Sequence, residues 1–164
     1  MNEQAERHAT FNSPLETGVR ALAVLAAAHP DLLDLQRLVE MDYLVVHSGD
    51  AGGPQSLHAP LPLRAGELLV RRGLIENGLY LMMSRGLVRR VPTANGFAYV
   101  ATEAAAPFLA SLTSRYMGRL RERAGWVTKR FEGVSTDDIT RITHRFFERW
   151  SSQFQPKEGG GASP

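Results

Sequence analysis

The sequence predicts a mainly α fold that includes a small β-hairpin. Apolar residues recur at spacings of three and four in most segments of the 164-residue chain, which is the period of a helix packed along one side. The exception lies between residues 87 and 101. There, two short runs rich in β-branched and aromatic residues flank a turn that contains Asn95-Gly96, a strong hairpin signal because both residues tolerate a positive φ.

The first helix is predicted to begin at Ser13. A serine can cap the first turn, Pro14 is harmless at the first helical position, and Glu16 completes a capping box. The helix is expected to end at His29-Pro30, because the residue before a proline avoids the helical conformation. Its apolar face consists of Leu15, Val19, Leu22 and Leu25.

A second helix is predicted to begin near Asp31 or Asp34 and to run to Val46. It is apolar nearly all round after Met41, which indicates a central, buried position. Asp42 falls on its apolar face, where a carboxylate must find a partner or stay protonated. We expect a structural Asp42 bonded to a backbone group or an arginine, in preference to a catalytic one.

The segment from His47 to about Pro62 contains three glycines and three prolines and predicts no regular secondary structure. Long loops of this kind are usually functional or disordered, so we interpret the segment as a contact surface or as a rigid crossing in place of a tight turn. It is not a phosphate-binding P-loop, because no Gly-Lys-Ser/Thr follows and no strand precedes it. Metal binding is disfavoured, because the spacing of the histidines and Asp50 matches no known signature. The partner-binding candidates in this segment are His47, Asp50, Gln55 and His58.

Residues 67–84 form the next predicted helix, and Gly86 stops it. The two strands are predicted at residues 87–91 and 97–101. Thr102 is expected to cap the following helix. Helix, two-stranded ribbon and helix together form a winged-helix-like pattern, with further helices at both ends.

The C-terminal part predicts a short helix over residues 102–112, interrupted at Pro107, and a longer one from about residue 113 to 131. A final helix is expected to begin at Ser135. Its apolar line should be buried on the body or against a partner and consists of Ile139, Ile142, Phe146, Phe147 and Trp150. Of these, Ile139, Phe146 and Trp150 are the partner-binding candidates. The row Arg141, Arg145 and Arg149 is interpreted as a solvated face. One domain over residues 12–154 is expected, with a flexible N-terminus (1–11) and a flexible tail (155–164).

Composition excludes several classes of function. The absence of cysteine rules out disulfides, thiolate metal sites and cysteine nucleophiles. The polar N-terminus resembles no signal peptide, and no stretch is long and apolar enough to span a membrane, so a cytoplasmic protein is expected. The formal net charge is only +2, yet all basic residues except Lys129 and Lys157 are arginines, which suit contacts with phosphate or carboxylate. No nucleophile–base pair or metal spacing emerges, so neither an enzyme nor a cofactor is expected.

Three stretches resemble a known family. They are Phe11 to Leu22, Asp42 to Pro54 with its His-Ser-Gly-Asp-Ala-Gly-Gly core, and Leu61 to Ile75. Together they are similar to the middle component of bacterial ABC-three-component defence systems, including the Lamassu type. The similarity extends over about residues 11–154.

The resemblance implies a small winged-helix-like subunit without enzymatic activity. Such a subunit works with an SMC-like ABC ATPase and a separate effector, often a nuclease, against phages or plasmids. Non-specific contact with double-stranded DNA is a further expectation, and no membrane partner is expected.

The alternative is a MarR-like transcriptional regulator that binds duplex DNA as a homodimer. In that case the helix of residues 67–84 would enter the major groove and the hairpin would reach phosphates. The candidate DNA-contacting residues are Arg71, Arg72, Arg85, Arg89, Arg90 and Asn95. The apolar run Leu79–Met83 argues against this alternative, because such a surface suits a core or a protein partner.

Overall fold

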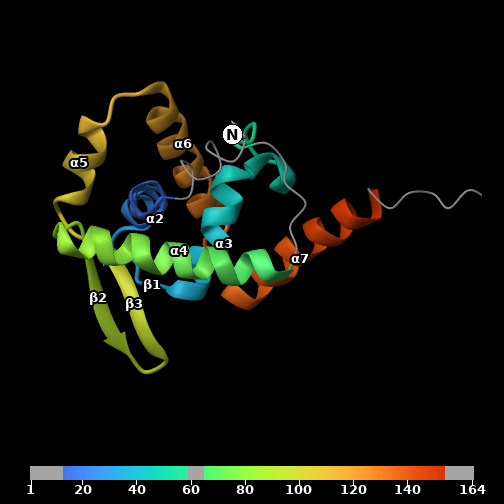
Figure 1. The fold of residues 1–164 in the computed structure, drawn as a ribbon, viewed down its shortest axis with the longest axis horizontal. Helices are drawn as coiled ribbons and strands as arrows, with labels where there is room; N and C mark the ends of the chain where they lie inside the picture. The colour runs from blue at the N-terminus through green and yellow to red at the C-terminus, as the bar shows by residue number, and fades with distance from the viewer. Residues whose placement is uncertain (1–12, 59–64, 154–164) are drawn as a thin grey trace, which may run out of the picture.

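The structure is a computed structural model that describes residues 13–58 and 65–153 (Figure 1). Within these ranges, the side chains of residues 65–69, 147 and 150–153 fall outside the description. The helices are α2 (Pro14–Ala28), α3 (Leu35–Val46), η1 (Ser48–Ala51, 3-10), α4 (Ala65–Ser84), α5 (Ala105–Ser111), α6 (Arg115–Arg130) and α7 (Thr136–Gln153). The strands are β1 (Leu33–Asp34), β2 (Val88–Thr93) and β3 (Gly96–Ala101). The predicted mainly α fold with a small β-hairpin is confirmed. The segments predicted to be flexible, 1–11 and 155–164, lie outside the described residues.

Helix α2 forms the centre of the molecule. Its predicted cap is confirmed, because the Ser13 hydroxyl accepts a hydrogen bond from the backbone N–H of Glu16 at 3.2 Å. Figure 1 views α2 nearly end-on, with α3, α4, α5 and α6 around it. Its residues from Thr17 to Leu25 are all buried, which explains the many alanines: small side chains let several helices approach one central helix.

Helix α3 begins at Leu35, and Asp34 caps it by accepting a hydrogen bond from the N–H of Arg37 at 2.7 Å. The later of the two predicted starting points is therefore the observed one. Every residue from Leu38 to Val46 is buried, which confirms the predicted central position of this helix.

The sheet has three antiparallel strands in the order β1-β3-β2, and the sequence predicts only two of them. The third, β1, is two residues long and pairs with β3 through Leu33 opposite Tyr99. The hairpin is observed where predicted, but its turn differs. Thr93 pairs with Gly96, and of the turn residues only Gly96 has a positive φ, of 114°. Asn95 keeps an ordinary negative φ, because the glycine alone absorbs the unusual geometry.

Helix α4 lies across α2 and ends as predicted. Gly86 has a φ of 70°, and its N–H and that of Leu87 bond to the carbonyls of Met83 and Met82, which is the Schellman ending. The apolar run at the end of the helix faces inward through Leu79 and Met82, both buried. The run is apolar because it packs into the core. Its composition therefore does not distinguish a protein-binding helix from a DNA-binding one.

Two predictions for helix α5 are wrong. Thr102 does not cap it, because its hydroxyl instead donates to the carbonyl of Gly86 at 2.7 Å and ties the end of β3 to the end of α4. Pro107 does not interrupt it either. The helix begins at Ala105, so Pro107 lies in the first turn, where a backbone N–H has no helical partner to lose.

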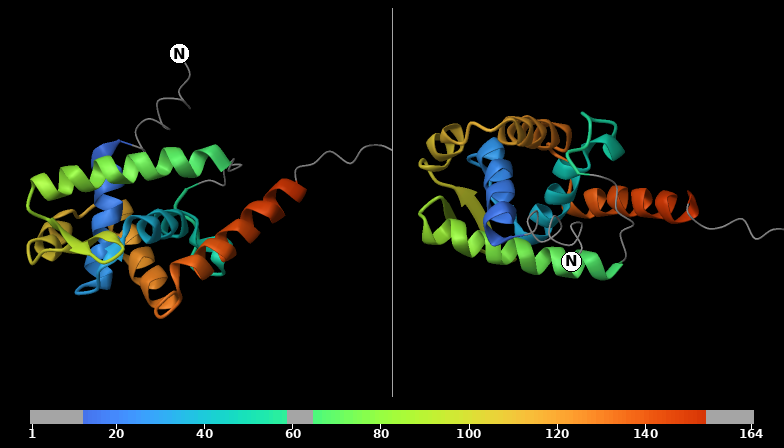
Figure 2. Two further views of the ribbon diagram at one scale, coloured as in Figure 1. Left: turned by 90° about the horizontal axis from the view of Figure 1, so that it is seen from below. Right: turned by 45° about the horizontal axis from the view of Figure 1, so that its top comes forward.

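Helices α6 and α7 begin at the caps Ser114 and Ser135, whose hydroxyls accept N–H bonds at 3.2 and 3.1 Å. The second of these was predicted. The apolar side chains Leu120, Val127 and Phe131 in and after α6 are buried. The second half of α7 projects away from the other helices in every view (Figures 1 and 2). Among the described helices, none is both long and apolar enough to cross a membrane.

Candidate functional site

A buried ion-pair centre joins three helices. Asp42 of α3 is 1% exposed and accepts hydrogen bonds from Arg20 of α2, from Nε to Oδ1 at 2.7 Å and from Nη2 to Oδ2 at 3.3 Å. Arg71 of α4 donates from Nη1 to Oδ2 at 2.5 Å. Asp42 therefore has arginine partners, as the sequence predicts. Burial alone would raise the pKa of Asp42, but the charges and hydrogen bonds of the two arginines outweigh it and lower that pKa to about 2.

Two histidines lie beside this centre. His47 packs its ring 4.8 Å from that of Tyr43, and His58 places Nε2 3.1 Å from the hydroxyl of Tyr116 on α6. Burial and then the neighbouring positive charges lower the pKa of each histidine to about 4. Both imidazoles are therefore neutral at pH 7. In the described part of the chain, no three His, Cys, Asp or Glu side chains gather where they could hold a metal ion.

The prediction that the segment after α3 lacks regular secondary structure is wrong for Ser48–Ala51 and holds for residues 52–58. It begins with the 3-10 helix η1, and the N–H groups of Leu57 and His58 both return to the carbonyl of Val46 at 3.0 and 3.1 Å. The hydroxyl of Ser48 donates to the carbonyl of Pro54 at 2.8 Å. These local hydrogen bonds satisfy backbone groups that no helix or strand pairs.

Helix α6 holds the same segment from the other side. The guanidinium of Arg123 donates to the carbonyl of Gln55 from Nε at 3.0 Å and from Nη2 at 2.8 Å. Gly53 lies so close to Trp126 that a Cβ at this position would come within 2.4 Å of the indole ring. The segment is therefore held against α6, which fits the interpretation of it as a rigid crossing.

The four partner-binding candidates in this segment differ in accessibility. His47 is 3% exposed, so it cannot make a direct contact with a partner. Asp50 is half-buried and accepts a hydrogen bond from Tyr43 at 2.9 Å, and His58 is half-buried as well. Gln55 is exposed and remains the candidate that a partner could reach.

Helix α3 also holds the C-terminal helices. Its buried Glu40 accepts hydrogen bonds from the hydroxyls of Thr140 at 3.0 Å and Thr143 at 2.7 Å, both on α7. Arg37 donates to the carbonyls of Phe131 at 3.0 Å and Val134 at 2.7 Å, where α6 has ended. Arg37 thereby satisfies carbonyl groups that have no partner within their own helix.

The predicted DNA-contacting arginines do not form one cluster. Arg71 is engaged with Asp42, and Arg72 donates to the side chain of Gln36 at 3.2 Å. Both lie on α4 some thirteen or fourteen residues before Arg85, which is about 20 Å along a helix of 1.5 Å rise per residue. Arg71 and Arg72 therefore lie far from the hairpin along α4.

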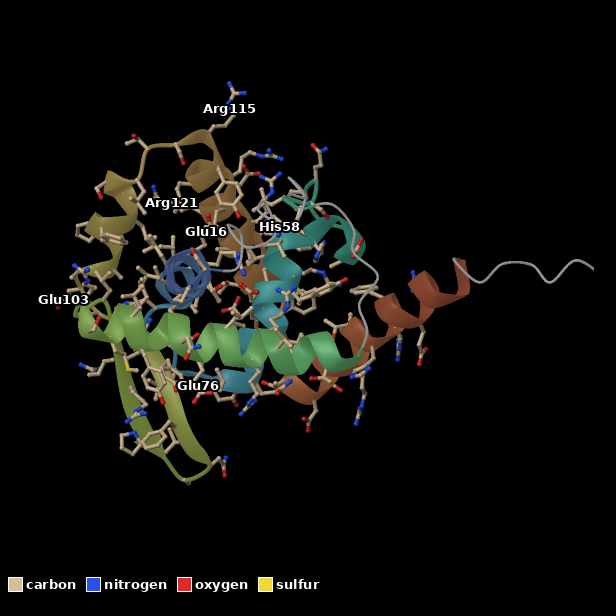
Figure 3. All side chains as sticks on the ribbon, in the orientation of Figure 1. Glu16, His58, Glu76, Glu103, Arg115 and Arg121 are labelled. Atoms are coloured by element: carbon tan, nitrogen blue, oxygen red, sulfur yellow. The ribbon has the colours of Figure 1, made fainter. Side chains whose placement is uncertain are left out.

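The hairpin end of the molecule remains positively charged. Arg85, Arg89, Arg90 and Asn95 are exposed. The guanidinium of Arg90 lies 4.2 Å from the ring centroid of Phe97, a side chain that is 51% exposed. Between Glu76 and Glu103, both labelled in Figure 3, the sequence contains no acidic residue. Exposed arginines of this kind can attract a polyanion.

The predicted apolar line of α7 is only partly enclosed. Ile139 is fully buried, whereas Ile142 and Phe146 are half-buried. The side chain of Trp150, the third partner-binding candidate on this helix, lies outside the described side chains.

Four residues with central roles escape the sequence analysis: Arg20, Arg37, Glu40 and Arg123. Arg20 and Glu40 are charged residues between apolar neighbours, and that signal could have marked them as buried and paired, whereas Arg37 and Arg123 have polar neighbours and give no such signal. The partners of all four lie between 22 and 103 residues away, so no local pattern names them. Each of these side chains is engaged in contacts that join separate segments of the chain, which favours a structural role.

A family model described as ABC-three component (ABC-3C) system Middle Component 2 matches residues 10–153. The match includes every helix and strand given above. No curated protein and no solved structure matches the chain.

Proposed function

The chain belongs to the Middle Component 2 family of ABC-three component systems, and from this membership we propose that it is a non-enzymatic adaptor in the cytoplasm. In this proposal it binds an SMC-like ABC ATPase and a separate effector, as in Lamassu-like defence against phages or plasmids. The adaptor needs no cofactor. The order α2, β1, α3, α4, β2, β3 supports a winged-helix-like interpretation of its body.

The observation that supports an adaptor is the placement of its projecting parts. The hairpin β2–β3 extends from one end of α4, and the second half of α7 extends beyond the other end (Figure 1). Between them, Asp42, Glu40 and Arg123 are committed to contacts that hold helices together. A rigid body with two extended ends suits a subunit that binds two partners.

Co-expression of the chain with the ATPase and effector encoded beside it tests this proposal. We expect a complex of all three proteins in size-exclusion chromatography, and loss of the ATPase–effector association when the chain is omitted. A complex of ATPase and effector that forms equally well without the chain would refute the adaptor role. Hydrolytic activity of the chain alone would refute its non-enzymatic character.

The exposed arginines of the hairpin favour an additional contact with double-stranded DNA. Contacts from Arg85, Arg89 and Arg90 would be made with phosphates, which gives weak binding with a Kd on the order of 10⁻⁴–10⁻⁶ M and little sequence preference. Substituting all three with Ala should weaken binding equally for unrelated duplexes in salt-titrated fluorescence anisotropy. A strong preference for one duplex would instead favour the alternative, a MarR-like transcriptional regulator.

A further inference from the structure

Helix α7 is held in one rotational setting by its first half. Ile139 is fully buried, and the hydroxyls of Thr140 and Thr143 bond to the carboxylate of Glu40 on α3. Hydrogen bonds from two successive turns to one carboxylate prevent the helix from rotating about its axis. The direction in which Arg145, Phe146 and Arg149 leave α7 is therefore fixed.

Two rows of side chains converge along α7 from Arg141 onward. Successive residues of a helix are about 100° apart, so the row Arg141, Arg145, Arg149 advances by about 40° at each step. The row begins almost opposite Ile139 and reaches the edge of the apolar line at Arg149. There the guanidinium lies 6.0 Å from the ring centroid of Phe146. Apolar and positive surface thus meet at the end that projects.

The charge of α7 from Arg141 onward is one-sided. Between Arg141 and Gln153 the sequence has three arginines and a single acid, Glu148, which gives a net charge of +2. Among the described residues, Arg141 pairs with Asp138 in the preceding turn, and the two side chains are 73% and 57% exposed. An exposed pair of this kind contributes little to stability, so Arg141 can exchange Asp138 for a carboxylate of a partner.

We propose that the exposed side of α7 from Arg141 onward is a docking surface for an acidic amphipathic helix of a partner protein. Apolar side chains of that helix pack on Ile142 and Phe146, and its flanking carboxylates pair with Arg145 and Arg149, the arrangement that sets partner choice in paired helices. A second copy of the chain fits less well, because it would bring another arginine row to the same surface. The inference rests on the proposed adaptor function, because it supposes a partner subunit.

The test compares two double charge reversals in the full-length chain. The variant Arg145→Glu with Arg149→Glu should lower the affinity for either the purified ATPase or the purified effector by at least about tenfold, because like charges then face each other. The matched control is Arg115→Glu with Arg121→Glu, which makes the same change of charge on α6, away from the projecting half of α7 (Figure 3). It should leave both affinities unchanged. Isothermal titration calorimetry with each partner separately identifies which of them supplies the helix.

Circular dichroism melting of each variant should match that of the parent chain, since Arg145 and Arg149 are exposed. Restored affinity when acidic residues of the partner helix are changed to Arg would establish direct pairing.

Equal affinity of the α7 variant and the parent would overturn this inference and leave the adaptor function intact. Failure of the parent chain to bind either protein would overturn both. A dimer of the chain alone that the α7 variant abolishes would assign the surface to a second copy, and loss of DNA binding alone would assign it to DNA.

Discussion

Gly18 of α2 and Gly78 of α4 face each other where the two helices cross. A Cβ on Gly18 would lie 2.7 Å from the carbonyl oxygen of Gly78, and a Cβ on Gly78 would lie 2.6 Å from the backbone nitrogen of Gly18. Neither neighbour is a flexible side chain that could move aside. The helices therefore touch backbone to backbone, and glycine is required at both positions.

Substitution of Gly78 with Ala should destabilise the fold by about 2 kcal/mol or more, because the added methyl group must push two helices apart. Gly73→Ala on the same helix is the matched control. A Cβ at this position meets nothing within 4 Å, so the better helix former should stabilise the protein by about 0.5–1 kcal/mol. Urea unfolding followed by circular dichroism measures both. A stable Gly78→Ala variant would contradict the observed crossing.

Substitution of Asp42 with Ala should lower the free energy of unfolding by about 3–5 kcal/mol, because it leaves the buried Arg20 without a counter-charge. Asp138→Ala removes an exposed ion pair with Arg141 and should cost less than about 1 kcal/mol. The difference between the two variants in chemical unfolding checks the prediction. Similar small effects would mean that Arg20 is hydrated.

Stability should fall as the pH is lowered from about 6.5 to about 4. In this window His47 and His58 bind protons in the unfolded chain but remain neutral in the folded one, whose pKa values are near 4. The part of the free energy of unfolding that depends on the two neutral histidines is fully present above pH 6.5. It is lost, by a few kcal/mol in total, as the pH falls towards the pKa of the histidines in the folded chain. Unfolding curves at several pH values measure this dependence. The variant His47→Gln should show a shallower fall, and an unchanged slope would contradict the assignment.

Substitution of Arg123 with Met should loosen the segment between η1 and His58. The carbonyl of Gln55 would lose both of its donors, at a cost of about 1–3 kcal/mol if it stays buried. Hydrogen exchange should become faster in residues 52–58 than in α2. The exposed Arg121, changed to Met, serves as the control on the same helix and should leave the exchange unchanged. Unaltered exchange in both variants would show that the segment holds itself in place.

Local signals in the sequence predict the elements that local interactions form. The cap at Ser13 and the helix stop at Gly86 depend on neighbours a few residues away, and both are observed. Strand β1 has no such signal, because two residues become a strand only when β3, some 65 residues later, pairs with them. Thr102 has the right chemistry for a cap but finds a better acceptor in Gly86.

The candidate sites show the same division. The apolar surroundings of Asp42 predict that it is paired, whereas the identity of its partners depends on how α2 and α4 cross α3. Arg71 was assigned to DNA contact because its face of α4 could not be deduced from the sequence. The fixed shape of the segment around Gln55 escapes prediction because Arg123, which holds it, is 68 residues away.

Helix α3 has a consequence for how the chain matures during synthesis. Asp42 leaves the ribosome after Arg20 but 29 residues before Arg71, and Glu40 precedes Thr140 by 100 residues and Thr143 by 103. Helix α3 is therefore translated early but completes its contacts late. Until α7 is translated, a buried carboxylate lacks these two donors, so a truncated chain retains a defect in its interior.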